Sequence, residues 1–245
     1  MGAGGIGITT KGGTGTNEGS IEGTGNNVRG MYTESGTIIN KGTISLTGND
    51  AIGMAGNKDS HVINEAGAVI TVTGDRVIGI YATSNTTVTN AGTIIVKGQG
   101  TGQGIVLSQG STLINSSSGT IQIDDAAPLQ SFSVEAGNSY QTPTIINSGV
   151  IKVSEKFETN GIDVVIKVDP KTVKAPTASE ISGVGYDPIA AGASYLISNS
   201  VHIEAPAFNI TAPLQVTGNF AEGTNVKKYK LEDVIKPGSG YGINA

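Results

Sequence analysis

The sequence predicts an all-β protein built as a right-handed parallel β-helix, in which coils of about 24 residues stack along one axis. Three observations predict this fold. Asparagine recurs at nearly constant intervals, and glycine recurs in step with it. Between these marks, Ile and Val alternate with Thr, Ser and Asn, which is typical of half-buried strands. The 3.6-residue period of an amphipathic helix is hard to find anywhere in the chain.

The asparagine repeat defines the coil. It comprises Asn17, Asn40, Asn64, Asn90, Asn115 and Asn147. The intervals are 23, 24, 26, 25 and 32 residues, and a Gly and then an Ile or Val follow each Asn, as in "TNEGSI" and "INKGTI". One such unit has room for three short strands and three turns but not for a helix. Because an amide carries both a donor and an acceptor, we expect the stacked Asn side chains to bond to one another along the axis, as structural groups.

Two glycine marks keep step with the asparagines. One Gly precedes an apolar residue in each coil, at Gly7, Gly30, Gly53, Gly79 and Gly104. A second Gly lies in "TGN" at 24–26, in "TGN" at 47–49 and in "TGD" at 73–75. We expect these glycines at turns with positive φ, or where a side chain would collide with the next coil.

The repeat weakens toward the C-terminus. All eight prolines follow residue 127, and nine of the eleven aromatic residues follow residue 131. Proline cannot donate to a strand ladder, so its absence from the first half agrees with paired strands there. We therefore divide the chain into coils at 1–167 and a boundary excursion with a capping β segment at 168–245. The longest Asn interval predicts one coil with an enlarged loop at 124–144.

Gly-rich coils containing "GTI", "IIN" and "VIGIYA", followed by a non-repeating β segment, resemble the passenger domain of classical autotransporters, the type V secretion systems of Gram-negative bacteria. The tail "LQVTGNFAEGTNVKKYKLEDVIKPGSGYG" is similar to the autochaperone-like cap of such passengers. The resemblance implies a large surface adhesin, displayed at the outer membrane or secreted. It also implies two partners: the protein's own outer-membrane β-barrel, and a host or bacterial receptor that is a protein or a glycan. The N-terminus lacks the pattern of a signal peptide, so we expect a fragment of a longer protein, monomeric by itself.

Composition excludes several classes of function. The net charge is −5 and the chain has only two arginines, which argues against nucleic acid as a partner. The absence of Cys excludes a disulfide scaffold and Cys-based zinc sites. We expect no cofactor and no metal. No apolar run is long enough to cross a membrane as a helix.

Two short motifs imitate catalytic or cofactor sites. "GAGGIG" at 2–7 has the spacing of a dinucleotide-binding loop, but it lacks the strand before it and the helix after it that such a loop needs. "DSH" at 59–61 suggests a triad, yet adjacent residues of an extended chain point to opposite faces. The repeat aligns these three residues with Asn85, Thr86 and Thr87, which predicts an ordinary turn.

Two further positions could carry chemistry. Asp124 and Asp125 form an adjacent acidic pair that could bind calcium, although a solvated loop is the favoured interpretation. His202 lies alone in a strand-like run and is expected at the surface or capped.

Three functions remain open from the sequence. The first is a non-catalytic stalk of an autotransporter adhesin, which supports adhesion and secretion-coupled folding. The second places the adhesive surface on this chain itself, on the loop at 124–144. The third is a β-helical polysaccharide lyase or hydrolase, which should line one strand column with several acidic and basic residues. Most of those positions here hold Thr, Ser or Asn, so we expect no catalytic residue.

Overall fold

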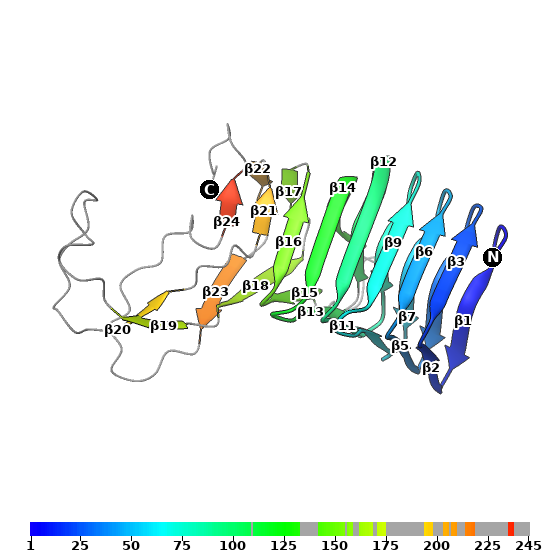
Figure 1. Cartoon of the computed structure of the whole chain (residues 1–245), viewed down its shortest axis with the longest axis horizontal. Coiled ribbons are helices and arrows are strands. Elements are labelled where there is room, and N and C mark those ends of the chain that lie inside the picture. The colour runs from blue at the N-terminus through cyan, green and yellow to red at the C-terminus, as the bar shows by residue number, and fades with distance from the viewer. Residues whose placement is uncertain are drawn as a thin grey trace, which may run out of the picture.

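The computed structural model describes residues 1–108, 110–132, 142–154, 156–158, 162–168, 171–174, 194–197, 203–205, 207–209, 214–218 and 235–237. In these residues the protein is all-β, and parallel strands stack into a solenoid of about five complete turns with no helix. Figure 1 shows the coils side by side along the long axis, from the N-terminal strands in blue to the green strands of the middle of the chain. The predicted parallel β-helix is therefore confirmed.

Two parallel sheets contain most of the strands. The 12-stranded sheet contains β1 (Ile6–Lys11), β3 (Ser20–Thr24), β4 (Arg29–Glu34), β6 (Thr43–Thr47), β7 (Ile52–Asn57), β9 (Val69–Thr73), β10 (Ile78–Ala82), β12 (Thr93–Ser108), β14 (Thr120–Phe132), β16 (Val150–Val153), β21 (Ile203–Ala205) and β24 (Ile235–Pro237). The 8-stranded sheet contains β2 (Thr14–Asn17), β5 (Thr37–Asn40), β8 (His61–Asn64), β11 (Thr87–Asn90), β13 (Thr112–Asn115), β15 (Thr144–Asn147), β18 (Asp163–Val168) and β23 (Leu214–Gly218). Two small pairs complete the set: β17 (Lys156–Glu158) with β22 (Ala207–Asn209), and β19 (Lys171–Lys174) with β20 (Ser194–Ile197).

The 12-stranded sheet joins two sides of the solenoid. In the early coils β1, β4, β7 and β10 form one side, and β3, β6 and β9 form another. The long strand β12 belongs to both, because Thr93–Lys97 pairs with β9 whereas its C-terminal half pairs with β10. Each coil thus contributes one strand to each of three sides.

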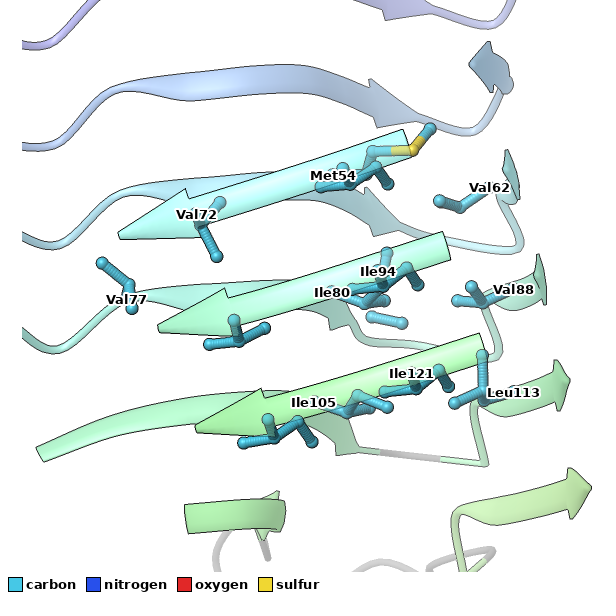
Figure 2. Packing of buried hydrophobic residues seen from close by; sticks show 14 of the residues in the cluster. Met54, Val62, Val72, Val77, Ile80, Val88, Ile94, Ile105, Leu113 and Ile121 are labelled. Carbon is cyan, nitrogen blue, oxygen red and sulfur yellow. The ribbon is translucent and has the colours of Figure 1, made fainter. Parts of the chain in front are cut away.

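The alternation of side chains in each strand produces the core. In β6, Ile44 and Leu46 are buried while the three residues around them are exposed. Their counterparts in the next coils are also aliphatic, so the interior consists of stacked columns of Ile, Val, Leu and Met, as Figure 2 shows for coils in the middle of the stack. Burial of this apolar surface is the main stabilising contribution available to such narrow coils.

The glycine that precedes the Met or Ile of each coil is required by the close approach of successive coils. A Cβ on Gly53 would lie 2.5 Å from the carbonyl oxygen of Gly79 and 2.7 Å from Cγ2 of Ile70. Both distances are well inside van der Waals contact, so a side chain would force the coils apart. By register the corresponding place after Gly104 falls on Pro128, between Ala127 and Leu129. The glycine column therefore ends at the coil where the sequence repeat also weakens.

The "TGN" and "TGD" marks form the turn from the third side of one coil, made of β3, β6 and β9, to the first side of the next coil, made of β4, β7 and β10. Gly25, Gly48 and Gly74 have φ values of 132°, 142° and 146°, a conformation that favours glycine. Two residues later Asp50 adopts a left-handed φ of 58°, which Asp tolerates better than most residues. This predicted role of the second glycine mark is confirmed.

The first part of the predicted loop at 124–144 is a strand in the structure. Residues up to Phe132 belong to β14, and the segment Ala126–Phe132 pairs in parallel with the second half of β12. The loop prediction was wrong for this part. Two aspartates and a proline made the segment resemble a turn, but it forms a strand because it pairs in register with β12 of the preceding coil. The remainder, 133–141, lies outside the described residues.

Four described strands after residue 200 continue the stack. β21 pairs in parallel with β16, β22 with β17, β23 with β18, and β24 with β21. Earlier in this segment β19 and β20 form an antiparallel pair. The residues of 168–245 between these strands lie outside the described part of the chain, and the division of the chain at 167/168 stays a prediction.

Candidate functional site

The asparagine column forms a continuous hydrogen-bonded ladder inside the solenoid. The Nδ2 atom of each Asn donates to Oδ1 of the Asn in the next coil toward the C-terminus. The five distances are 2.8, 2.9, 2.8, 2.8 and 2.7 Å, running from Asn17 to Asn147. All six side chains are buried, the most exposed being Asn17 at 6 %. The expected ladder is therefore present, and the amide dipoles point in one direction along the axis.

The second proton of the amide is also used. Nδ2 of Asn17 donates to the carbonyl oxygen of Thr43 at 3.0 Å, and Asn115 reaches the carbonyl of Val150 at 3.3 Å. These carbonyls belong to the first residue of the strand that follows the Asn of the next coil, β6 for Thr43 and β16 for Val150, so each amide links two coils through both side chain and backbone. The side-chain amides of the column thus form their hydrogen bonds within the protein. We therefore interpret the column as structural and not as a ligand site.

The ladder ends where the repeat ends. In the register of the 8-stranded sheet, Asn147 pairs with Ile166, a residue that carries no amide. Asn147 instead donates from Nδ2 to the carbonyl oxygen of Gly149 at 3.1 Å.

The Asp59-Ser60-His61 motif lies in a turn. Asp59 has a left-handed φ of 54°, Ser60 is buried, and His61 is exposed at the start of β8. The Ser60 hydroxyl donates to the carbonyl oxygen of Asn57 in its own turn. Thr86 occupies the same place one coil later and donates to the carbonyl of Thr83 at 2.6 Å. The Ser60 proton is therefore bound to backbone, and His61 lies on the opposite face of the chain, away from it.

The "GAGGIG" motif begins the first coil. Gly4 has a positive φ of 71° and Gly7 belongs to the glycine column, and the chain continues as strand β1. A strand in this place offers no helix N-terminus for a pyrophosphate.

The acidic pair lies at the bend within β14. Asp124 accepts a hydrogen bond from Nε2 of Gln122 at 2.9 Å. Asp125 has a left-handed φ of 51°, and its backbone N–H donates to Oγ of Ser154 at 3.0 Å. In the described part of the chain no three His, Cys, Asp or Glu side chains gather where they could hold a metal ion. His202 lies outside the described residues.

In the described part of the chain, three ion pairs connect neighbouring coils on the outer surface, and the longest joins Lys41 to Glu18 at 3.6 Å. Lys58 pairs with Glu34, and Arg76 donates to both carboxylate oxygens of Asp50 at 2.7 Å. The hydrogen bond from Lys58 lowers the pKa of Glu34, and the one from Arg76 lowers the pKa of Asp50. The same contacts raise the pKa of Lys58 and of Arg76. These exposed pairs join coils at the surface as the Asn ladder joins them inside.

Two tyrosines that the sequence analysis did not single out lie on the outer face of β4 and β10. Tyr32 and Tyr81 both pair in register with Ala55 of β7, from opposite sides. A sequence signal for them exists, because each follows the glycine of the first mark by two positions, in "RGMYT" and "VIGIYA". Since the repeat fixes the register, that position predicts one shared outward column.

Comparison with known protein families gives two matches. Residues 51–165 match the family described as BigA third pectate lyase-like domain, and residues 190–245 match the family described as BigA beta sandwich domain. No curated protein and no solved structure matches the chain. Together with the β-solenoid, the matches fit a bacterial surface β-helical protein of the adhesin-like kind. The described residues contain no helix long and apolar enough to span a bilayer.

Proposed function

We propose that this chain is a non-catalytic stalk of an autotransporter-type bacterial adhesin, displayed at the outer membrane or secreted, which holds a binding region away from the cell. The observation that carries the proposal is the unbroken Asn ladder of six buried side chains. In this ladder the buried side-chain amides hydrogen-bond one coil to the next. The outward positions of the 8-stranded sheet are mainly Thr and Ile, which suits a rod more than a catalytic groove.

Repeat solenoids suit this role because their length is proportional to the number of coils. Each coil contacts only its neighbours, so a coil can be added or removed without redesigning the rest. Each added coil lengthens the rod by about 4.8 Å. The partners that we propose are the protein's own outer-membrane barrel at the C-terminal side and a receptor, either protein or glycan, on a host or bacterial surface.

The test is to display the chain on cells with an epitope tag at its N-terminal end and an outer-membrane anchor at its C-terminal end. Extra copies of the coil 41–64, inserted after Asn64, should increase antibody labelling of the tag, because the tag then extends further beyond the surface polysaccharide. Tag labelling that does not change with the number of coils would contradict a stalk.

Catalysis is tested separately with the purified chain. We expect no unsaturated product from pectin-like polymers and no hydrolysis of ester or peptide substrates. A reproducible activity that disappears in Ser60→Ala or Asp124→Ala, with the fold intact by circular dichroism, would replace the stalk with the enzyme alternative.

A further inference from the structure

The outer face of β4, β7 and β10 carries a column that differs from the rest of the rod. Residues 1–131 contain only two aromatic side chains, Tyr32 and Tyr81, and the register places both in this one column with Ala55 between them. The preceding residues, Met31 and Ile80, are fully buried in the core, so alternation directs the tyrosines outward. Two strand spacings separate the tyrosines, or about 9–10 Å.

The residue between the tyrosines is shielded. Ala55 is on the outward side of its strand, yet only 2 % of its surface is exposed. Both tyrosines are half-buried. We call this surface, a small residue with a half-buried tyrosine on each side, the saddle.

Polar groups border the saddle at the ends of the same strands. Glu34 and Lys58 form an ion pair, and Thr83 donates to Oδ1 of Asn57 at 3.0 Å. On the other side of the tyrosines, the guanidinium of Arg29 lies over the ring of Tyr32, 5.7 Å from its centre. Hydrogen-bond donors and acceptors therefore lie on or next to the strands that carry the two aromatic rings.

We propose that this saddle, the Tyr32–Ala55–Tyr81 face, binds a linear polysaccharide that runs along the solenoid axis. A sugar ring has an apolar face of C–H groups, which can pack on an aromatic ring, and a rim of hydroxyls that needs donors and acceptors. A polymer that runs along the solenoid axis could contact both tyrosines, because they lie in one column parallel to that axis. The proposal names the partner class for the adhesin-like role proposed above, and places a contact on the rod itself.

A protein partner is the less favoured occupant. Stable protein interfaces bury roughly 1,200–2,000 Å² around an apolar centre. Among the described residues the only large hydrophobic residue that is exposed is Ile6 in the first coil, with 41 % of its surface accessible. The Tyr32–Ala55–Tyr81 face is one column wide, which suits a chain of sugars more than a globular surface.

The first test is binding of the purified chain to a polysaccharide array, followed by calorimetry with hexamers of β-1,4-linked glucose, β-1,4-linked N-acetylglucosamine and hyaluronan. Tyr32→Ala and Tyr81→Ala should each weaken binding to the recognised glycan about tenfold, the loss of roughly one ring's stacking energy. Tyr81→Phe keeps the ring and should bind nearly as well as the wild type. Ile63→Ala, an outward apolar residue on the other sheet, is the control and should not change the affinity.

The second test changes the spacing of the two rings, and it also removes Asn57 and Lys58 from the border of the saddle. Deleting residues 41–64 removes Ala55 and brings the two tyrosines into adjacent coils, so binding should fall although both rings remain. Deleting residues 91–115 shortens the rod by one coil beyond the tyrosines and should leave binding unchanged. Circular dichroism verifies that each variant is folded.

Three results would overturn the proposal. They are no binding to any glycan of the array, full affinity in both Tyr→Ala variants, and capture only of a protein that masks the face. None of them bears on the stalk, whose test measures the reach of a tag and involves no glycan.

Discussion

A single asparagine in the ladder serves three coils at once. Nδ2 of Asn64 donates to Asn90 at 2.8 Å, while its Oδ1 accepts from Asn40 at 2.9 Å. Because the column is buried, neither neighbour can turn to water if Asn64 is removed. A polar group buried without a partner costs more free energy than the bond itself contributes.

Replacing Asn64 with Ala should therefore lower the free energy of unfolding by about 1–3 kcal/mol. It leaves the Nδ2 donor of Asn40 and the Oδ1 acceptor of Asn90 unpaired. The control is Asn26→Ala, an exposed residue that accepts one backbone hydrogen bond, and its effect should stay within about 0.5 kcal/mol. Urea unfolding followed by circular dichroism measures both, and equal midpoint shifts would count against the ladder.

At the scale of the coil, small side chains decide how closely neighbours approach. The glycine column lets the Ile side chains of the third side fill the space beside it, as the Ile70 methyl does next to Gly53. Not every glycine has this role. A Cβ at Gly13 would meet nothing within 4 Å, and the φ of Gly13 is not positive.

This contrast gives a matched pair of substitutions. Gly53→Ala should destabilise the protein by about 1–3 kcal/mol, because the methyl overpacks the contact with Gly79 and Ile70. Gly13→Ala should be neutral or slightly stabilising, because it only restricts the unfolded chain. Thermal unfolding of the two variants checks this, and a Gly53→Ala protein as stable as wild type would show that the coils are free to separate there.

The elements that the sequence predicted well are those whose residues occupy an obligatory place in every coil. The sequence repeat aligns Asn64, Gly53 and Gly48 with their counterparts in other coils, because stacking requires the same residue type at these positions of each coil. The segment at 126–132 could not, since its strand is set by pairing with β12 and not by its own composition. The outward face of Tyr32 and Tyr81 was missed for a related reason: its residues are placed by the repeat but are not themselves repeated.

The described coils form a one-dimensional stack, in which each strand pairs in register with the matching strand of the neighbouring coil. The same three contacts join every adjacent pair of coils in the first half of the chain: the backbone ladders, the interior amides and the aliphatic columns. In such a stack stability is roughly the sum of coil and interface terms. Removal of one whole coil should therefore be tolerated, whereas removal of part of a coil should not.

The most direct measurement compares two deletions by denaturant unfolding. Deleting residues 41–64 removes one coil and leaves Asn40 to stack on Asn90, so we expect a cooperative transition at a modestly lower denaturant concentration. Deleting residues 41–52 removes only half as many residues, but it takes away β6 and leaves one coil without its third side. We expect that variant to lose its β-sheet circular dichroism or to unfold without a cooperative transition. A half-coil deletion as stable as the whole-coil deletion would contradict the claim that each coil must pair in register with its neighbours.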